Sequence, residues 1–328
     1  MHRPAGRARR LAAAVLALTA GLAAAQTPSP YPTKPIRLIV PIAAGSVTDV
    51  VLRAAAPLLS ERLGQPLLID NRTGAGGIVG AEACAKAPPD GYTLCAMYQD
   101  ITSLNPFMYE KLPYDPAKDF APVGRLLYVT TALVVPRALP VNTVAELKAY
   151  ALQNPRAVNL GTLGEGSVQE LFGAWLNREW KTQIVGVPYK GGAPIANAVA
   201  AGEIQMGQMG LGNFIGLVQA GQLRALALST EQRSKQLPDV PTNTEAGLGG
   251  FPAKIWWGIA APAATPTGAI ARFNAAMQEV FSDPKMRDFM EARYVEAALD
   301  SPQDFAAFLV RDRERTGALV RLAREPAR

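Results

Sequence analysis

Short apolar runs alternate along the chain with longer segments whose apolar residues recur at helical spacing. The short runs are bounded by glycine and proline, which is typical of buried strands. Strands are expected near residues 38–42, 66–69, 92–97, 158–161, 184–188, 204–209 and 223–229. Helices are expected to follow them, ending near residues 63 and 87 and spanning about 143–153, 167–180 and 194–201. This alternation predicts an α/β protein with parallel sheets covered by helices on both faces.

Two longer β-type runs, 126–135 and 251–261, are long enough to leave one sheet and enter another. They predict a two-lobed fold, with one lobe formed by residues 26–127 and 256–328 and the other by 128–255. Helices at about 267–281, 284–292 and 302–323 are expected to pack back on the first lobe. A cleft between two lobes is a preferred place for a ligand.

The first 25 residues have the pattern of a signal peptide. Four arginines precede an apolar segment, and Ala23-Ala24-Ala25 predicts cleavage before Gln26. Arg9-Arg10 permits a twin-arginine signal, but the rest of that motif is missing, so a general secretory signal is favoured. The protein is therefore expected in the periplasm, and no later stretch reaches the roughly 18 apolar residues of a membrane span.

Removal of this leader changes the charge and the chemistry that remain. The leader holds four basic residues, which leaves 29 basic against 27 acidic residues and a net charge of +2, so a nucleic-acid partner is not expected. It also holds His2, the single histidine, which excludes a histidine triad and the commonest zinc ligand from the mature chain. We expect no metal site and no cofactor. Cys84, expected on a helix, and Cys95, expected on a strand, either form a disulfide or are buried as small apolar residues.

The stretch 38–49 has the pattern of an anion-binding turn. A buried strand leads into Gly45, and Ser46, Thr48 and Asp49 are N-cap candidates for the next helix. Such a turn directs unpaired backbone N–H groups and a partial positive charge at one point, which suits an anion. The alternative is an ordinary strand-to-helix turn.

Three further glycine turns follow predicted strands. The turn at 74–80 has the spacing G-x-G-x-x-x-G, which does not match the dinucleotide fingerprint, although Asn71 beside it is available to a cleft. The turn at 161–167 lacks the lysine of a P-loop but offers N–H groups and hydroxyls at a helix start. Lys190, in the turn 189–192, either meets a carboxylate or is a surface lysine. Ser46 and Ser167 have no general base to make them nucleophiles.

Two groups of residues lie next to predicted strand ends or crossings. Tyr98, Gln99, Asp100 and Thr102 follow the third strand at the position where open α/β sheets bind ligands. Alternation along 251–261 directs one of its two adjacent tryptophans inward, either into the core or into a ligand wall.

An ordered series of motifs resembles the periplasmic substrate-binding receptors of the tripartite tricarboxylate transporter family, also called Bug receptors. The resemblance runs from about Tyr31 to Leu322. Its motifs include Val40-Pro41…Ala44-Gly45…Thr48-Asp49, Asn71…Gly74-Ala75-Gly76-Gly77, Pro89-Asp90-Gly91-Tyr92-Thr93-Leu94, Leu104-Asn105-Pro106, Leu112-Pro113-Tyr114-Asp115, Pro188-Tyr189-Lys190-Gly191, Pro238-Asp239-Val240-Pro241-Thr242 and Trp257-Gly258…Ala261-Pro262.

The resemblance implies a Venus-flytrap fold that closes on a small organic carboxylate. Backbone amides, hydroxyls and ordered water of both lobes would hold the carboxylate. With the residues found above, the expected ligand-binding set is Gly45, Ser46, Val47, Thr48, Asp49, Asn71, Gln99, Gly161, Thr162, Gly164, Gly166, Ser167, Tyr189, Lys190 and Gly191. The chain departs from the family pattern at Ser46, usually a second glycine, at Gln169-Glu170, where a histidine is usual, and around Gln205, where an aspartate is common.

The expected function is therefore a monomeric periplasmic receptor that delivers a carboxylate to membrane transporter subunits and is not an enzyme. One alternative is a ligand sensor for a membrane kinase. The other is an exported carboxylate-processing enzyme using Asp49, Asp100 or Lys190. The sequence leaves the identity of the carboxylate open.

Overall fold

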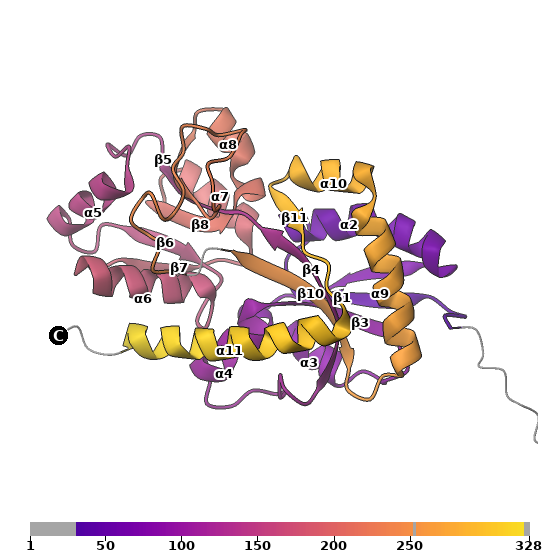
Figure 1. Cartoon of the computed structure of the whole chain (residues 1–328). Helices are drawn as coiled ribbons and strands as arrows, with labels where there is room; N and C mark the ends of the chain where they lie inside the picture. The colour runs from indigo at the N-terminus through magenta and orange to yellow at the C-terminus, as the bar shows by residue number, and fades with distance from the viewer. Residues whose placement is uncertain (1–30, 252–253, 325–328) are drawn as a thin grey trace, which may run out of the picture.

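The computed structural model describes residues 31–251 and 254–324. The predicted signal peptide, 1–25, and the start of the proline-rich segment after it lie outside these residues. The described chain forms two β-sheets, each packed with helices, that lie next to one another (Figure 1). We call the part built on the first sheet the first lobe and the part built on the second sheet the second lobe. The expected two-lobed α/β fold is confirmed.

The first sheet has six strands in the order β11-β4-β10-β3-β1-β2. Its strands are β1 (Ile36–Val40), β2 (Leu67–Asn71), β3 (Thr93–Tyr98), β4 (Phe120–Val129), β10 (Ile255–Pro262) and β11 (Val295–Ala297). Strand β1 pairs in parallel with β2 and β3, whereas β10 pairs antiparallel with β3 and β4. The predicted strand–helix series forms the parallel part of the sheet, and the crossing strands add antiparallel pairs to it. The strands that cross between lobes enter without a helical crossover, so they need not run parallel to their neighbours.

The second sheet repeats this plan with five strands in the order β7-β6-β8-β5-β9. Its strands are β5 (Thr131–Pro136), β6 (Asn159–Thr162), β7 (Val185–Pro188), β8 (Met206–Gly210) and β9 (Leu223–Leu228). Strand β6 pairs in parallel with β7 and β8, and β5 pairs antiparallel with β8 and β9. Each lobe thus has three parallel strands whose carboxyl ends can carry binding turns.

The helices follow the predicted positions closely. The helices that precede or follow strands of the first sheet in the chain are α2 (Val47–Leu63), α3 (Ile78–Ala85), α4 (Asn105–Met108), α9 (Thr267–Ser282), α10 (Pro284–Glu291) and α11 (Pro302–Arg324). Those of the second lobe are α5 (Val144–Gln153), α6 (Val168–Trp180), α7 (Gly192–Ala200) and α8 (Ile215–Gln219). Short helical turns lie at η2 (Ala75–Gly77), η3 (Asp100–Leu104) and η4 (Leu211–Asn213).

The apolar run predicted at 126–135 proves to be two strands in two different sheets. Strand β4 ends at Val129 and β5 begins at Thr131, so Thr130 alone separates them. Strand β4 also begins earlier than predicted, at Phe120, with Pro122 inside it opposite Ala260. A register shift between Ile259 and Ala260 marks a bulge at this point. Bulges tolerate proline, which explains why the sequence pattern hid the first half of the strand.

The C-terminal helix has nearly its predicted length but contacts both lobes. Helix α11 has 23 residues, roughly 35 Å at the helical rise, and its first part packs on β4. Towards its end it contacts α6, and Val320 is buried in the apolar cluster of the second lobe. Figure 1 shows this helix running beside the first sheet towards α6. The prediction that all three C-terminal helices pack on the first lobe holds only in part, because the end of α11 packs on the second lobe.

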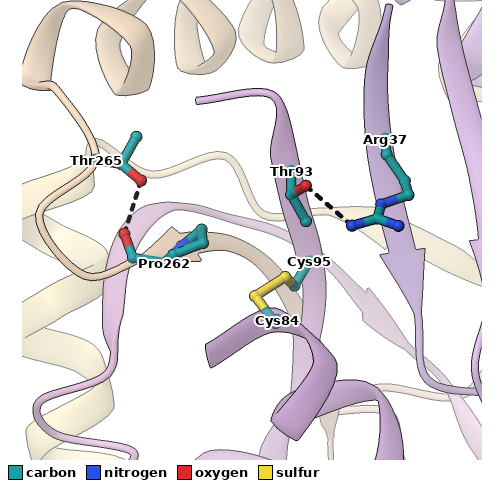
Figure 2. Close-up of a disulfide and its surroundings, with 6 residues drawn as sticks. All are labelled: Arg37, Cys84, Thr93, Cys95, Pro262 and Thr265. Atoms are coloured by element: carbon teal, nitrogen blue, oxygen red, sulfur yellow. Dashed lines mark hydrogen bonds between the residues drawn. A yellow bond between two sulfur atoms is a disulfide. The ribbon is translucent and has the colours of Figure 1, made fainter. Parts of the chain in front are cut away.

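The two cysteines form a disulfide, which decides between the alternatives left open by the sequence. Cys84 on α3 is bonded to Cys95 on β3, and their Cα atoms are 6.1 Å apart. Both residues are fully buried. Figure 2 shows the bond between Cys84 on the helix and Cys95 on the neighbouring strand. In the part of the chain that the structure describes, no helix is both long and apolar enough to cross a membrane.

Candidate functional site

A narrow cavity lies between the two lobes, where the turns after β1 and β3 face the start of α6. Its volume is about 40 Å³. A wider pocket of about 380 Å³ adjoins it and shares Ile42, Tyr98 and Leu163 with its wall. Of the predicted ligand-binding residues, Ser46, Val47 and Thr48 line the narrow cavity, and Tyr189 and Lys190 line the wider pocket.

The start of α2 presents uncapped backbone to the narrow cavity. Ser46 is the N-cap by backbone position, but its side chain makes no capping bond and donates instead to the Ala43 carbonyl at 2.5 Å. The first backbone bond of the helix is donated by the Val50 N–H to the Ser46 carbonyl, at 2.9 Å, so the amides of Val47 and Thr48 precede the helical ladder. An uncapped first turn carries the partial positive charge that attracts a carboxylate.

Asp49 and Asn71 shape this turn and do not line the cavity. The Asp49 carboxylate accepts from the Gly45 N–H at 2.9 Å, from Arg53 at 3.0 Å and from the Asn71 amide at 2.8 Å. Asn71 also donates to the Ile42 carbonyl at 3.0 Å. These bonds fix the loop from Ile42 to Gly45 against β2. Asp49 and Asn71, which were predicted to bind the ligand, therefore hold the first-lobe turn in position.

The second-lobe turn is organised mainly by its own hydrogen bonds. Ser167 caps α6 by accepting from the Glu170 N–H at 3.4 Å, and Thr162 donates to the Glu170 carboxylate at 3.0 Å. Thr162 also accepts from the Gly164 N–H at 3.2 Å. None of these three predicted residues, Thr162, Gly164 and Ser167, lines either pocket described above.

Glycines of the second lobe allow the two lobes to approach one another. A Cβ on Gly166, whose φ is +78°, would lie 2.4 Å from the Tyr109 ring, and the Tyr109 hydroxyl donates to the neighbouring Glu165 carbonyl. A Cβ on Gly191 would lie 3.1 Å from the Ala43 Cβ. Gly161 has a different role, since a Cβ there would lie 2.7 Å from Ile195 in the core of the second lobe.

Asp100 bridges the lobes at the start of α6. It lies in η3, immediately after β3, and its Oδ2 accepts from the Val168 N–H at 3.3 Å. Burial raises the pKa of this carboxyl to about 7, and the bond from Val168 offsets only part of that rise. Its other oxygen, Oδ1, is buried without a hydrogen-bond partner. Asp100, an acid of the first lobe, therefore lies at the start of α6, where the carboxylate of a ligand was predicted to bind.

Gln99, beside Asp100, is placed outside the cavity. Its amide donates to the Thr316 hydroxyl of α11 at 3.3 Å, and the residue lines a separate pocket with Trp256 and Asp312. Successive residues of a helical turn point about 100° apart, so the turn that directs Asp100 into the cavity directs Gln99 away from it. Its predicted contact with a ligand has no support from its position.

The cavity is also lined by side chains outside the expected ligand-binding set. Trp257 stacks on Tyr98 with ring centroids 4.6 Å apart, and both rings line the cavity wall. Trp256 points to the opposite face, where it donates to Asp312 at 3.0 Å under α11. Gln169 lines the cavity and has an unpartnered Oε1. The alternation of side chains along the strand indicated that one of the two tryptophans points inward. The position of Gln169 at the cavity depends on how the lobes pack, which no local pattern reports.

A metal site has no support within the described residues, where no group of three or more histidine, cysteine or acidic side chains is arranged to hold an ion.

Residues 51–324 match the family model described as tripartite tricarboxylate transporter family receptor. The chain belongs to this receptor family. Protein BugT of Bordetella pertussis is 30% identical over 304 residues, which cover 92% of this chain and 93% of BugT. The resemblance seen in the sequence motifs is confirmed.

Two solved receptor structures extend the comparison to ligands. The structure described as R. palustris Rpa4515 with adipate is 33% identical, with a TM-score of 0.85 over 89% of this chain and 98% of that one. MatC (Rpa3494) from Rhodopseudomonas palustris with bound malate is 30% identical, with a TM-score of 0.83 over 88% of this chain and 100% of MatC. Both of these relatives hold a dicarboxylate in a fold similar to that of this receptor.

Proposed function

We propose that this protein is a periplasmic solute-binding receptor that captures a small organic carboxylate between its lobes and delivers it to a membrane transporter. The observation that carries the proposal is the uncapped start of α2, whose Ser46, Val47 and Thr48 line a buried cavity between the lobes. Adipate in one relative and malate in another support the same ligand class. Binding without turnover and a monomeric state are parts of this proposal.

Lobe closure gives the proposed receptor its mechanism. The closing units are the predicted lobes, 26–127 with 256–328 and 128–255. A ligand that contacts α2 and α6 together stabilises the closed state over the open one, so its differential affinity drives closure. Contacts across the cleft, such as Tyr109 with Glu165, already connect the lobes in this structure. A transporter that recognises the closed arrangement would then receive only loaded receptor.

A thermal-shift screen against a panel of mono-, di- and tricarboxylates that includes amino acids tests the proposal. A true ligand at 100 times its Kd is expected to stabilise the protein by about 2.7 kcal/mol. Co-purification with transporter subunits that depends on this ligand would support delivery. Ligand-dependent capture of a membrane kinase instead would indicate the sensory alternative. A panel without any stabilising carboxylate would contradict the proposed function.

Replacement of Thr48 by valine is expected to weaken carboxylate binding about tenfold, because a charge-assisted hydrogen bond at the cavity wall is lost. Isothermal titration calorimetry measures the change. Thr267→Val is the matched control, since Thr267 lies in the first turn of α9, is exposed and is remote from the cavity. Equal affinities of the Thr48 variant and the native protein would exclude the Thr48 hydroxyl as a contact of the carboxylate.

A further inference from the structure

Two buried acceptors without partners belong to residues that line the same small cavity. Asp100 Oδ1 comes from the first lobe and Gln169 Oε1 from the second, and each residue is 1% exposed. Buried polar atoms are nearly always hydrogen-bonded in folded proteins. Two orphaned acceptors at one place therefore indicate a bound group that donates more than one hydrogen bond.

Nothing in the described protein supplies a positive charge to Asp100. Within residues 31–251 and 254–324, its one hydrogen bond comes from the neutral Val168 N–H, and it takes part in no ion pair. Lys190 lines the wider pocket and not this cavity. A buried carboxylate with no cation is unfavourable, and a ligand that brings a cation removes the penalty.

We propose that the ligand of this receptor carries an ammonium group, bound between Asp100 and Gln169, in addition to its carboxylate. This inference rests on the proposed function and narrows its ligand class to amino acids and similar zwitterions. The carboxylate lies at the start of α2 and the ammonium at the opposite wall. The stacked rings of Tyr98 and Trp257 add a surface that favours cations.

The chemistry of an ammonium group fits better than the alternatives. A protonated Asp100 satisfies both oxygens only by donating its proton to Gln169, and it keeps that proton only below its raised pKa of about 7. A water molecule could donate to both oxygens but brings no charge to an ionised Asp100. An ammonium group has three N–H donors and a positive charge, and a cavity of about 40 Å³ is large enough for such a head group. The rest of the ligand would extend into the wider pocket.

The test compares ligand pairs that differ by one amino group: propionate with alanine, succinate with aspartate, and glutarate with glutamate. Calorimetric titration of the native protein is expected to show at least tenfold tighter binding of the amino member in at least one pair. Asp100→Asn keeps the size of the side chain and removes its charge, and it is expected to reduce this preference to less than threefold. Asp70→Asn is the matched control, because Asp70 lies on β2 outside both pockets and pairs with Arg72.

Gln169→Leu provides a second variant in case the Asp100 variant folds poorly. It is expected to weaken binding of the amino member severalfold while leaving the plain acid unchanged. Tight binding of a plain acid with no preference for its amino partner would overturn this inference and still support a carboxylate receptor. A preference that persists in both variants would also overturn it. Failure of every acid and amino acid to bind would overturn the proposed function as well.

Discussion

The difference in unfolding free energy between the native protein and Asp100→Asn is expected to change by about 4 kcal/mol between pH 4 and pH 8 in the absence of ligand. The folded-state pKa of Asp100 is raised from 3.8 to about 7 by burial. Between these values the folded state binds more protons than the unfolded state, so stability falls as the pH rises. The stabilising contribution is complete below pH 3.8 and lost above pH 7.

Urea unfolding at a series of pH values measures this effect. The asparagine variant lacks the titrating group, so it is expected to be similar to the native protein at pH 4 and more stable at pH 8. Asp70→Asn, which changes a partly exposed carboxylate, controls for the general effect of removing one charge. If the stability curves of the native and Asp100→Asn proteins run parallel through this range, Asp100 does not have the raised pKa.

Removal of the disulfide is expected to lower the unfolding free energy by about 3 kcal/mol. Cys84 and Cys95 are 11 residues apart, and closing a loop of that size restricts the unfolded chain by about this amount. The bond also holds α3 to the middle of the first sheet. The double variant Cys84→Ala/Cys95→Ala, unfolded in urea beside the native protein, measures the loss.

Reduction provides the control for this prediction. Dithiothreitol is expected to destabilise the native protein by a similar amount and to leave the double alanine variant unchanged. A loss below about 1 kcal/mol would show that the bond contributes little beyond the packing of two buried side chains.

The sequence predicted most of the fold because strand–helix alternation is a local pattern. It located the parallel strands of both lobes and the helices that follow them. It failed where the pattern was short or broken, as at the three-residue strand β11 and at the first half of β4, which contains Pro122 and Gly124. The pairing of these segments depends on partners far away in the chain, which local patterns cannot report.

For the narrow cavity, the predicted residues that line it all belong to the first lobe, whereas Tyr189 and Lys190 of the second lobe line the wider pocket. Ser46 and Thr48 follow a strand and begin a helix, and both line the narrow cavity. The sequence places Asp100 at the end of a predicted strand, but its burial at the start of α6 depends on how the lobes meet. Gln169 stands out in the sequence only as part of Gln169-Glu170, where the resembled family usually has a histidine. Contacts between lobes arise from tertiary structure, so no spacing in the sequence encodes them directly.

The position of Trp257 gives this receptor an internal optical reporter. Four tryptophans are present, and Trp175, Trp180 and Trp256 are buried in apolar clusters outside the narrow cavity. Trp257 alone among them lines that cavity, stacked on Tyr98. Indole fluorescence responds to the polarity and charge of its surroundings. Occupancy of the cleft can therefore be read from the emission of the unlabelled protein, with the other three indoles as a steady background.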